Sequence, residues 1–338
     1  EAWFDTPAED FLSPLGLPAS EWEKVTDVLD VWFDSGTTHA FALRERGIID
    51  AETGQADLYM EGSDQHRGWF HSSLLQSVGT TGRAPYRNVV THGFTLDEKG
   101  MKMSKSIGNT IVPEKVVQQY GADILRLWVA QTDYTADQRI GPEILKGTAD
   151  SYRRLRNTMR YMLGALSDFT DADRTEPAEM PELERWVLHR VAELDQIVRE
   201  GYARYDFQGV FQAVFTFATV DLSAFYFDVR KDALYCDGDT LRRRAARTVL
   251  DILFHRLTTW LAPVLVFTME EVWLERFPGD ETDRAKTGTH CTHVFCFRCL
   301  KEWSSCGHGK ECDNPGTQLL SARDLESFGR GHCPQVRT

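Results

Sequence analysis

Two short runs rich in β-forming residues, at 58–63 and 86–96, enclose a segment whose apolar residues recur with helical spacing. The enclosed segment, GWFHSSLLQSVGTTG at 68–82, ends at glycines that commonly terminate helices. A strand, a helix and a second strand running in one direction form a βαβ unit with parallel strands. A further helix is expected from Pro113, because proline suits the first helical position. The sequence therefore predicts an α/β fold for residues 1–142.

After residue 142 the spacing of apolar residues becomes that of helices. Residues 143–169 form one long amphipathic segment, which we interpret as a connecting helix, and 170–181 form a polar, proline-containing linker. Four helical stretches follow, and their apolar residues recur at three and four, so 181–282 are expected to pack as a helical bundle. The predicted fold class is α/β followed by all-α.

The formal net charge of −13 argues against a strongly basic nucleic-acid coat protein, although local basic faces can still bind nucleic acid. No apolar run reaches the roughly 18 residues that a membrane helix needs, and no signal peptide opens the chain. We therefore expect a cytoplasmic protein without a membrane partner, and a monomer.

A glycine-bounded stretch, GMKMSKSIGN at 100–109, carries two lysines and two serines. Lys102 and Lys105 flank Ser104, and Gly100 and Gly108 provide hinges. Ammonium and hydroxyl groups on such a loop suit phosphates, including a pyrophosphate leaving group. The alternative is a solvated surface turn, as most charged runs are.

The sequence MKMSKSIGN resembles the second signature loop of class I aminoacyl-tRNA synthetases. DVLDVWFDSGTTHA at 27–40 and LYMEGSDQHRGWFHSSLL at 58–75 are similar to the isoleucyl-tRNA synthetases of that class, as are SYRRLRNTMRYML and RYDFQGVFQAV in the helical half. The resemblance covers residues 1 to about 282. It implies the second half of a Rossmann-like catalytic domain, followed by a helical anticodon-binding domain.

The resemblance also implies substrates and site residues: L-isoleucine, ATP with Mg²⁺, and tRNA(Ile). Lys102, Lys105 and Ser104 would act on the ATP phosphates. Two tryptophans, Trp32 and Trp69, would wall the isoleucine side chain. Contacts to ATP or the adenylate fall on Glu61, Asp64, Gln65, His92, Gly93 and Lys105. Alternative readings of single residues remain: either tryptophan could be core, Glu61 could cap a helix, and Asp64 could be a helix N-cap.

Two arginine clusters are candidate phosphate contacts for tRNA. Their members are Arg153, Arg154, Arg156, Arg160, Arg243 and Arg247. The alternative is a solvated helix face with charge pairs. For the whole chain, a non-catalytic tRNA-binding fragment is the alternative to an isoleucine–tRNA ligase.

The first signature of the family, His-x-Gly-His, does not occur among the ten histidines of this sequence. We therefore expect this chain alone to activate isoleucine poorly or not at all.

The last 48 residues, 291–338, contain six of the seven cysteines and do not resemble the synthetase continuation. Thiolates and imidazoles at this spacing suit tetrahedral zinc. The predicted ligands are Cys291, Cys296, Cys299, Cys306, His308 and Cys312. Residues 290–313 weakly resemble part of the in-between zinc module of RING-type ubiquitin ligases. We interpret residues 290–338 as a possible zinc-binding tail, and the junction near 282–289 as chimeric.

Overall fold

The computed structural model describes residues 2–49 and 53–278. The chain divides into two compact units, residues 1–90 and 91–338, and each is described by itself. The predicted zinc ligands of the tail lie outside the described residues, so the structure does not bear on them.

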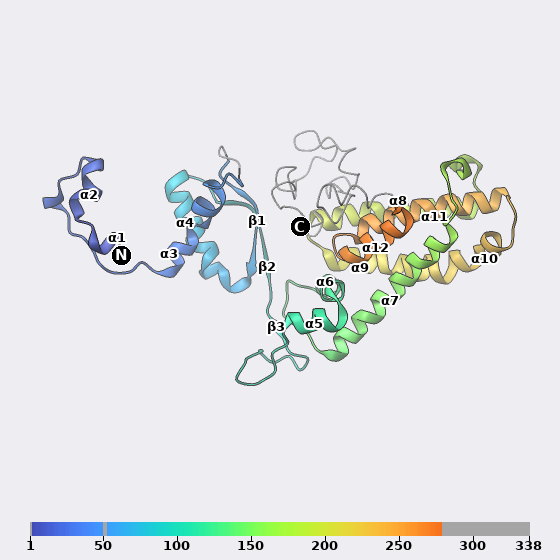
Figure 1. Ribbon diagram of the computed structural model, residues 1–338, viewed down its shortest axis with the longest axis horizontal. Coiled ribbons are helices and arrows are strands. Elements are labelled where there is room, and N and C mark those ends of the chain that lie inside the picture. Colours follow the sequence, from blue (N-terminus) through green and yellow to red (C-terminus); the bar gives the residue numbers. More distant parts are fainter. Residues whose placement is uncertain (1, 50–52, 279–338) are drawn as a thin grey trace. The chain divides into compact units, whose positions relative to one another are not determined.

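The first unit begins with short helices and contains one two-stranded sheet (Figure 1). In chain order its elements are α1 (Ala2–Asp5), α2 (Ala8–Leu12), the 3₁₀ turns η1 (Ser13–Leu15) and η2 (Ala19–Glu21), α3 (Val31–Gly36), the π-helical η3 (His39–Arg44), β1 (Ala56–Gly62), the 3₁₀ turn η4 (Ser63–Arg67), α4 (Trp69–Thr81) and β2 (Tyr86–His92).

The sheet pairs β1 with β2. The backbone N–H of Ala56 donates to Pro85 O at 2.8 Å, and Asn88 Nδ2 donates to Asp57 O at 3.0 Å. Contacts between the beginnings of both strands are those of a parallel pair joined by a crossover helix. The predicted βαβ unit is therefore confirmed. The helix ends at Gly82, whose φ of 73° is accessible to glycine at little cost.

The second unit opens with a small domain that carries the lysine-rich loop. Its strands β3 (Thr95–Leu96) and β4 (Gln138–Arg139) pair in parallel, and α5 (Pro113–Tyr120) and α6 (Ala122–Gln131) lie between them in sequence. The single helix expected from Pro113 is thus two helices. Gly121, at φ 88° and ψ 158°, separates them because that conformation cannot continue a helix.

The remainder of the second unit is a helical bundle (Figure 1). Its elements are α7 (Pro142–Ala165), the 3₁₀ turns η5 (Asp171–Asp173) and η6 (Pro177–Glu179), α8 (Glu182–Ala203), α9 (Phe207–Thr216), the π-helical η7 (Phe217–Tyr226), α10 (Phe227–Tyr235), α11 (Leu241–Leu261) and α12 (Val266–Arg276). Fully buried Trp260, Tyr226 and Phe254 are among the largest side chains of its core, which spans all of these α-helices. The predicted bundle is confirmed.

Elements α9, η7 and α10 form one 29-residue helical run, Phe207–Tyr235, with a mean hydropathy of 1.4 over its most apolar window. Its length and composition would allow it to cross a membrane, which no other described helix does. Its buried residues, including Val214, Leu222 and Tyr226, belong to the bundle core. Buried core helices pass the same test, so the run fits a helix inside a bundle.

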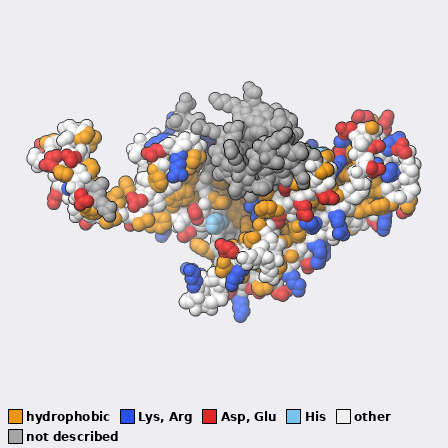
Figure 2. All heavy atoms as spheres, in the orientation of Figure 1, with side chains coloured by type: hydrophobic (Ala, Val, Ile, Leu, Met, Phe, Trp, Pro, Cys, Tyr) orange, Lys and Arg blue, Asp and Glu red, His pale blue; other side chains and the backbone are white. Residues whose placement is uncertain are grey.

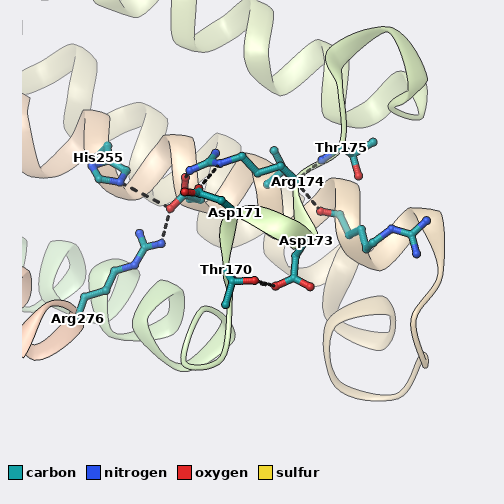
Figure 3. Close-up of polar contacts among 10 residues, drawn as sticks. Thr170, Asp171, Asp173, Arg174, Thr175, His255 and Arg276 are labelled. Atoms are coloured by element: carbon teal, nitrogen blue, oxygen red, sulfur yellow. Dashed lines mark hydrogen bonds and ion pairs between the residues drawn. The ribbon is translucent and has the colours of Figure 1, made fainter.

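The segment 170–181, expected to be a linker, is docked on α11 through polar contacts (Figure 3). Thr170 and Asp173 form a capping box that opens η5. Arg174 Nη2 donates to Asp251 Oδ2 at 2.6 Å, and the Thr175 N–H donates to Thr248 Oγ1 at 3.0 Å. A buried backbone needs such partners, so this segment is an integral part of the bundle.

The small domain is fixed to the corner between α11 and α12 by two residues of α6. The Asp123 carboxylate accepts hydrogen bonds from the Thr268 N–H at 2.8 Å and from Thr268 Oγ1 at 2.6 Å. Arg126 donates to Pro263 O at 2.6 Å and to Val264 O at 3.0 Å. These bonds satisfy backbone groups at the two helix ends, and they join the lysine-loop domain to the bundle.

Candidate active site

In the first unit, Trp69 is held in a fixed orientation at the start of α4. Its ring stacks on Tyr59 of β1, with centroids 4.3 Å apart and planes at 4°, and its Nε1 donates to Ser35 O at 2.9 Å. Tyr59 is 3% exposed, and burial raises the pKa of its hydroxyl, which lies 3.2 Å from Ser73 Oγ. A half-buried Trp69 with a buried support can serve as a rigid apolar wall.

Trp32 lies beside the same stretch of backbone. A Cβ built on Gly68 would lie 2.9 Å from Trp32 Cη2, so the glycine permits close approach of this ring to the start of α4. Trp32 is 47% exposed, which contradicts the alternative that it is a core residue. The structure therefore brings the two predicted wall residues to one place.

The polar residues predicted to contact the adenylate lie at the C-terminal end of β1, which contains Glu61, and in the turn η4 that follows it. Glu61 and Asp64 are exposed, and Gln65 is half-buried. Gln65 Oε1 accepts from the Trp69 N–H at 3.0 Å, and its Nε2 donates to Asp64 Oδ2 at 3.1 Å. Gln65, rather than Asp64, thus supplies the side-chain acceptor at the start of α4. The two carboxylates lie at and just beyond the C-terminal end of a strand of a parallel pair, where α/β proteins place ligands.

His92 is the last residue of β2, whose final two residues fall in the second unit, and Gly93 follows it. At Gly93 the backbone runs very close to another segment. A Cβ on Gly93 would lie 2.3 Å from both the carbonyl carbon and oxygen of Ala136, so only glycine fits. The Gly93 N–H donates to Tyr134 O at 3.0 Å, and His92 Nδ1 lies 2.8 Å from Gly93 O.

The lysine-rich loop follows β3 and is folded around two side chains that sequence reasoning missed. Asp97 accepts from the backbone N–H groups of Lys99 and Met101, and it also accepts from Asn109 Nδ2 at 2.9 Å. These bonds lower the pKa of the Asp97 carboxyl. The bond from the Met101 N–H has the largest effect, followed by the bond from Asn109. An Asp before a glycine turn and an Asn beyond a glycine are typical turn formers, which was the available signal.

Lys102 and Lys105 are exposed, and among residues 2–49 and 53–278 neither has a carboxylate within ion-pair distance. Between them, half-buried Met103 packs against the apolar cluster of α5 and α6. Figure 2 shows Lys and Arg side chains at the surface of the loop that lies beside β3 in Figure 1. Uncompensated ammonium groups on an anchored loop are suited to an anionic ligand.

The predicted tRNA contacts fall into two groups in the structure. Arg154 and Arg160 are exposed on α7, and no ion pair within the described part of the chain involves them. Three others are engaged: Arg153 pairs with Asp150 at 2.8 Å, Arg156 binds both carboxylate oxygens of Glu271, and Arg243 lies 3.5 Å from Leu234 O.

Arg247 is 4% exposed, in contact with Asp168 and Ala165 O, with its guanidinium over the ring of Phe169. Its guanidinium is therefore not presented to a phosphate in this structure.

Among the residues that the structure describes, no group of three or more His, Cys, Asp or Glu side chains is placed to hold a metal ion. Mg²⁺ commonly binds through one or two carboxylates together with the phosphates of a nucleotide.

Two family models match the chain in consecutive regions. Residues 1–141 match the class I tRNA synthetases for I, L, M and V, and residues 184–293 match the anticodon-binding domain of tRNA ligases. A parallel α/β portion carrying an anchored lysine loop, followed by a helical bundle, defines a class I aminoacyl-tRNA synthetase.

Comparison with curated relatives identifies which member of this class the chain resembles. The isoleucine–tRNA ligase of Ruegeria pomeroyi is 78% identical over 281 residues, which are 83% of this chain and 29% of that protein. Those of Caulobacter vibrioides and Brucella abortus biovar 1 are 58% and 57% identical, over 82% of this chain and 28% of theirs. The chain belongs to the isoleucine–tRNA ligase family. It spans less than a third of the length of these relatives.

Solved structures share the fold. The Agrobacterium radiobacter K84 agnB2 LeuRS, in a ternary complex with tRNA and LeuAMS, superposes with a TM-score of 0.60 at 21% identity, over 75% of this chain and 32% of that one. Mycobacterium tuberculosis methionyl-tRNA synthetase bound by methionyl-adenylate gives 0.53 at 18% identity, over 66% and 46%.

Proposed function

We propose that this chain takes part in the ATP-dependent activation of L-isoleucine and in its transfer to tRNA(Ile). The observation that carries the proposal is the 78% identity to an isoleucine–tRNA ligase over 281 residues. The anchored and exposed lysine pair supports it independently, because it presents two positive charges that no described carboxylate neutralises.

In the proposed reaction, a carboxylate oxygen of isoleucine attacks the α-phosphorus of ATP, and pyrophosphate leaves. Lys105 and Lys102 stabilise the negative charge that develops on the leaving pyrophosphate, and Ser104 adds a hydroxyl donor. Mg²⁺ accompanies the phosphates as their counter-ion. No side chain of the protein has to act as a nucleophile, since the enzyme contributes position and charge stabilisation.

The remaining predicted residues would hold the adenylate and the amino acid. Glu61, Asp64 and Gln65 offer acceptors and donors to the ribose and to the isoleucine head group. His92 and Gly93 contact the adenine side. Trp32 and Trp69 wall the isoleucine side chain, and an apolar wall separates isoleucine from valine by only about 1–3 kcal/mol.

We also propose that the bundle binds tRNA, with exposed Arg154 and Arg160 as the strongest candidates for phosphate contacts, and that the protein works in the cytoplasm. Arg153, Arg156 and Arg243 can contribute only if their present contacts rearrange.

Isoleucine-dependent exchange of labelled pyrophosphate into ATP by the full chain tests the catalytic proposal. We expect Lys105→Ala to lower the rate by about 10²–10³-fold, the size of the loss when one preorganised donor is removed. Lys99→Ala is the matched control, because it removes an exposed lysine of the same loop outside the signature. Low absolute rates are sufficient because variants are compared. No exchange by the wild type, or equal rates for both variants, would refute the proposal.

Zinc binding by the tail is a separate proposal, carried by the Cys and His spacing alone. Metal analysis of the purified full chain should find about one zinc per chain, and substitution of Cys296 and Cys299 by Ser should abolish it. A metal-free chain would remove the proposal.

A further inference from the structure

A pair of side chains, Asp97 before the lysine signature and Asn109 at its last position, closes the base of the loop. The Asp97 N–H donates to Met101 O at 2.9 Å, and the Met101 N–H donates to Asp97 Oδ1 at 2.8 Å. Asn109 Nδ2 then donates to Asp97 Oδ2 at 2.9 Å. We call this hydrogen-bonded pair the clasp. It joins residues twelve positions apart, one at each end of the loop.

Asn109 also binds the backbone on both sides of Met103. Its Nδ2 donates to Lys102 O at 3.2 Å, and its Oδ1 accepts from the Ser104 N–H at 2.9 Å. The Asn109 amide group therefore hydrogen-bonds to the carbonyl of Lys102 and to the N–H of Ser104, the residue before Lys105. Both of its donor–acceptor functions are used, which makes Asn109 hard to replace.

The rest of the loop is built on this base. The Gly108 N–H donates to Ser104 O at 3.1 Å, so residues 104–108 form a turn in which Lys105 is exposed. The Ile111 N–H lies 3.4 Å from Met103 Sδ, which helps to fix the thioether under the loop. Gly100, at φ 82°, and Gly108, at φ 74°, supply the turns that the clasp requires.

The clasp is connected to the sheet of the small domain. Leu96, next to Asp97, forms an isolated antiparallel bridge with Lys102, and it belongs to β3, which pairs with β4. The Ile140 N–H donates to Leu96 O at 3.0 Å. The position of the lysine backbone is thus determined by hydrogen bonds that lead back to regular structure, while the lysine side chains themselves have no such restraint.

We propose that Asp97 and Asn109 are positioning residues for pyrophosphate release, because the clasp sets where the Lys102 and Lys105 ammonium groups meet the phosphates. This inference rests on the proposed function. Donors that are placed before the reaction stabilise developing charge without reorganisation, so the clasp acts mainly on kcat. It acts through the lysines and not on the substrate directly.

Asn109→Asp is the most informative single change. It keeps the acceptor for the Ser104 N–H, removes the donor to Lys102 O, and places a second carboxylate against Asp97. We expect kcat for isoleucine-dependent pyrophosphate exchange to fall at least about tenfold, as expected for a lost charge-assisted hydrogen bond, with a smaller change in KM for ATP. The midpoint of thermal unfolding should not change, since local loop contacts contribute little to global unfolding.

Two further comparisons separate positioning from general structural damage. The reciprocal variant Asp97→Asn/Asn109→Asp restores an amide–carboxylate pair with the donor on the other side, and it should regain part of the lost kcat, because the donor to Lys102 O is still missing. In a Lys105→Ala background, Asn109→Asp should cost much less than it does in the wild type, because the group that it positions is gone.

The outcomes distinguish this inference from the proposed function. If Lys105→Ala has no effect, the proposed function fails. If Lys105→Ala lowers the rate but Asn109→Asp leaves kcat unchanged, or lowers it equally in both backgrounds, the positioning role is refuted while the proposed function stands.

Discussion

Three cationic or ionisable side chains, Arg174, Arg276 and His255 (Figure 3), converge on the buried carboxylate of Asp251 in α11. Asp251 is 2% exposed. It accepts from Arg174 Nη2 at 2.6 Å and from Arg276, and His255 Nε2 lies 3.6 Å away. We predict that Asp251→Asn, which removes the charge and keeps the shape, strongly destabilises the bundle.

The loss of unfolding free energy can be worked out from the buried Arg276 guanidinium that Asp251→Asn leaves without its carboxylate partner. The Arg276 side chain is 9% exposed, and its Nη1 has no hydrogen-bond partner among the described residues. Breaking a buried pair by removing one partner costs about 3–5 kcal/mol. Arg276 also lies 4.5 Å from the ring centroid of Phe254 and 5.0 Å from that of Phe277, which retains part of its stabilisation. We therefore expect about 3 kcal/mol, or a fall of roughly 6–12 °C in Tm.

Asp171→Asn is the matched control, because Asp171 pairs with the same Arg174 at 2.8 Å but has a side chain that is 91% exposed. An exposed pair contributes less than about 1 kcal/mol. Urea and thermal unfolding of the full chain, followed by circular dichroism, measure both variants. The reasoning is refuted if Asp251→Asn costs no more than Asp171→Asn.

Three other predictions concern the loop domain and the bundle. Gly93→Ala should lower the free energy of unfolding by about 1–3 kcal/mol through overpacking. Gly164→Ala should not, because a Cβ at that position meets no atom within 4 Å. Thermal unfolding of the two variants tests this difference. Arg160→Ala should weaken tRNA binding and reduce the slope of log affinity against log salt concentration by about 1. Arg247→Ala should instead lower the midpoint of thermal unfolding. Equal slopes for the wild type and Arg160→Ala would contradict this prediction. The pKa of Asp97 is lowered, so the clasp is retained above the ordinary carboxyl pKa of about 4 and opens as pH falls through the depressed value. Exchange of the loop amides should show no additional opening of the clasp between pH 8 and 5, and opening near pH 6 would contradict the assignment.

Periodicity predicted the regular elements of this chain, but not where glycine geometry interrupts them. The helix at 68–82 was predicted correctly with an end at Gly82, whereas Gly79, the other glycine at the end of this segment, lies inside the helix. The run from Pro113 was read as one helix, because isolated glycines are tolerated within helices. Gly121, at φ 88°, ends α5 and precedes α6, and both helices contribute buried residues to one apolar cluster.

The candidate site residues named from the sequence are close together in sequence, and the sequence analysis did not name Asp97 and Asn109, which loop closure brings together. Trp69 and the residues that follow β1 lie within one motif, whereas Asp97 and Asn109 interact only once the loop has closed. Arginines illustrate the same limit. Arg160 and Arg247 look alike in sequence, but one is exposed and the other buried, because burial depends on which helix face meets a neighbour.

Equilibrium binding of ATP–Mg²⁺ to the full chain tests most directly the central claim, that the lysine loop is a phosphate site. Calorimetric titrations should compare the wild type with Lys105→Ala and with the control Lys99→Ala at two salt concentrations. The account predicts that Lys105→Ala weakens binding about tenfold or more and reduces its salt dependence, while Lys99→Ala binds like the wild type. Equal affinity of all three proteins for ATP, or equal losses in both variants, would contradict it.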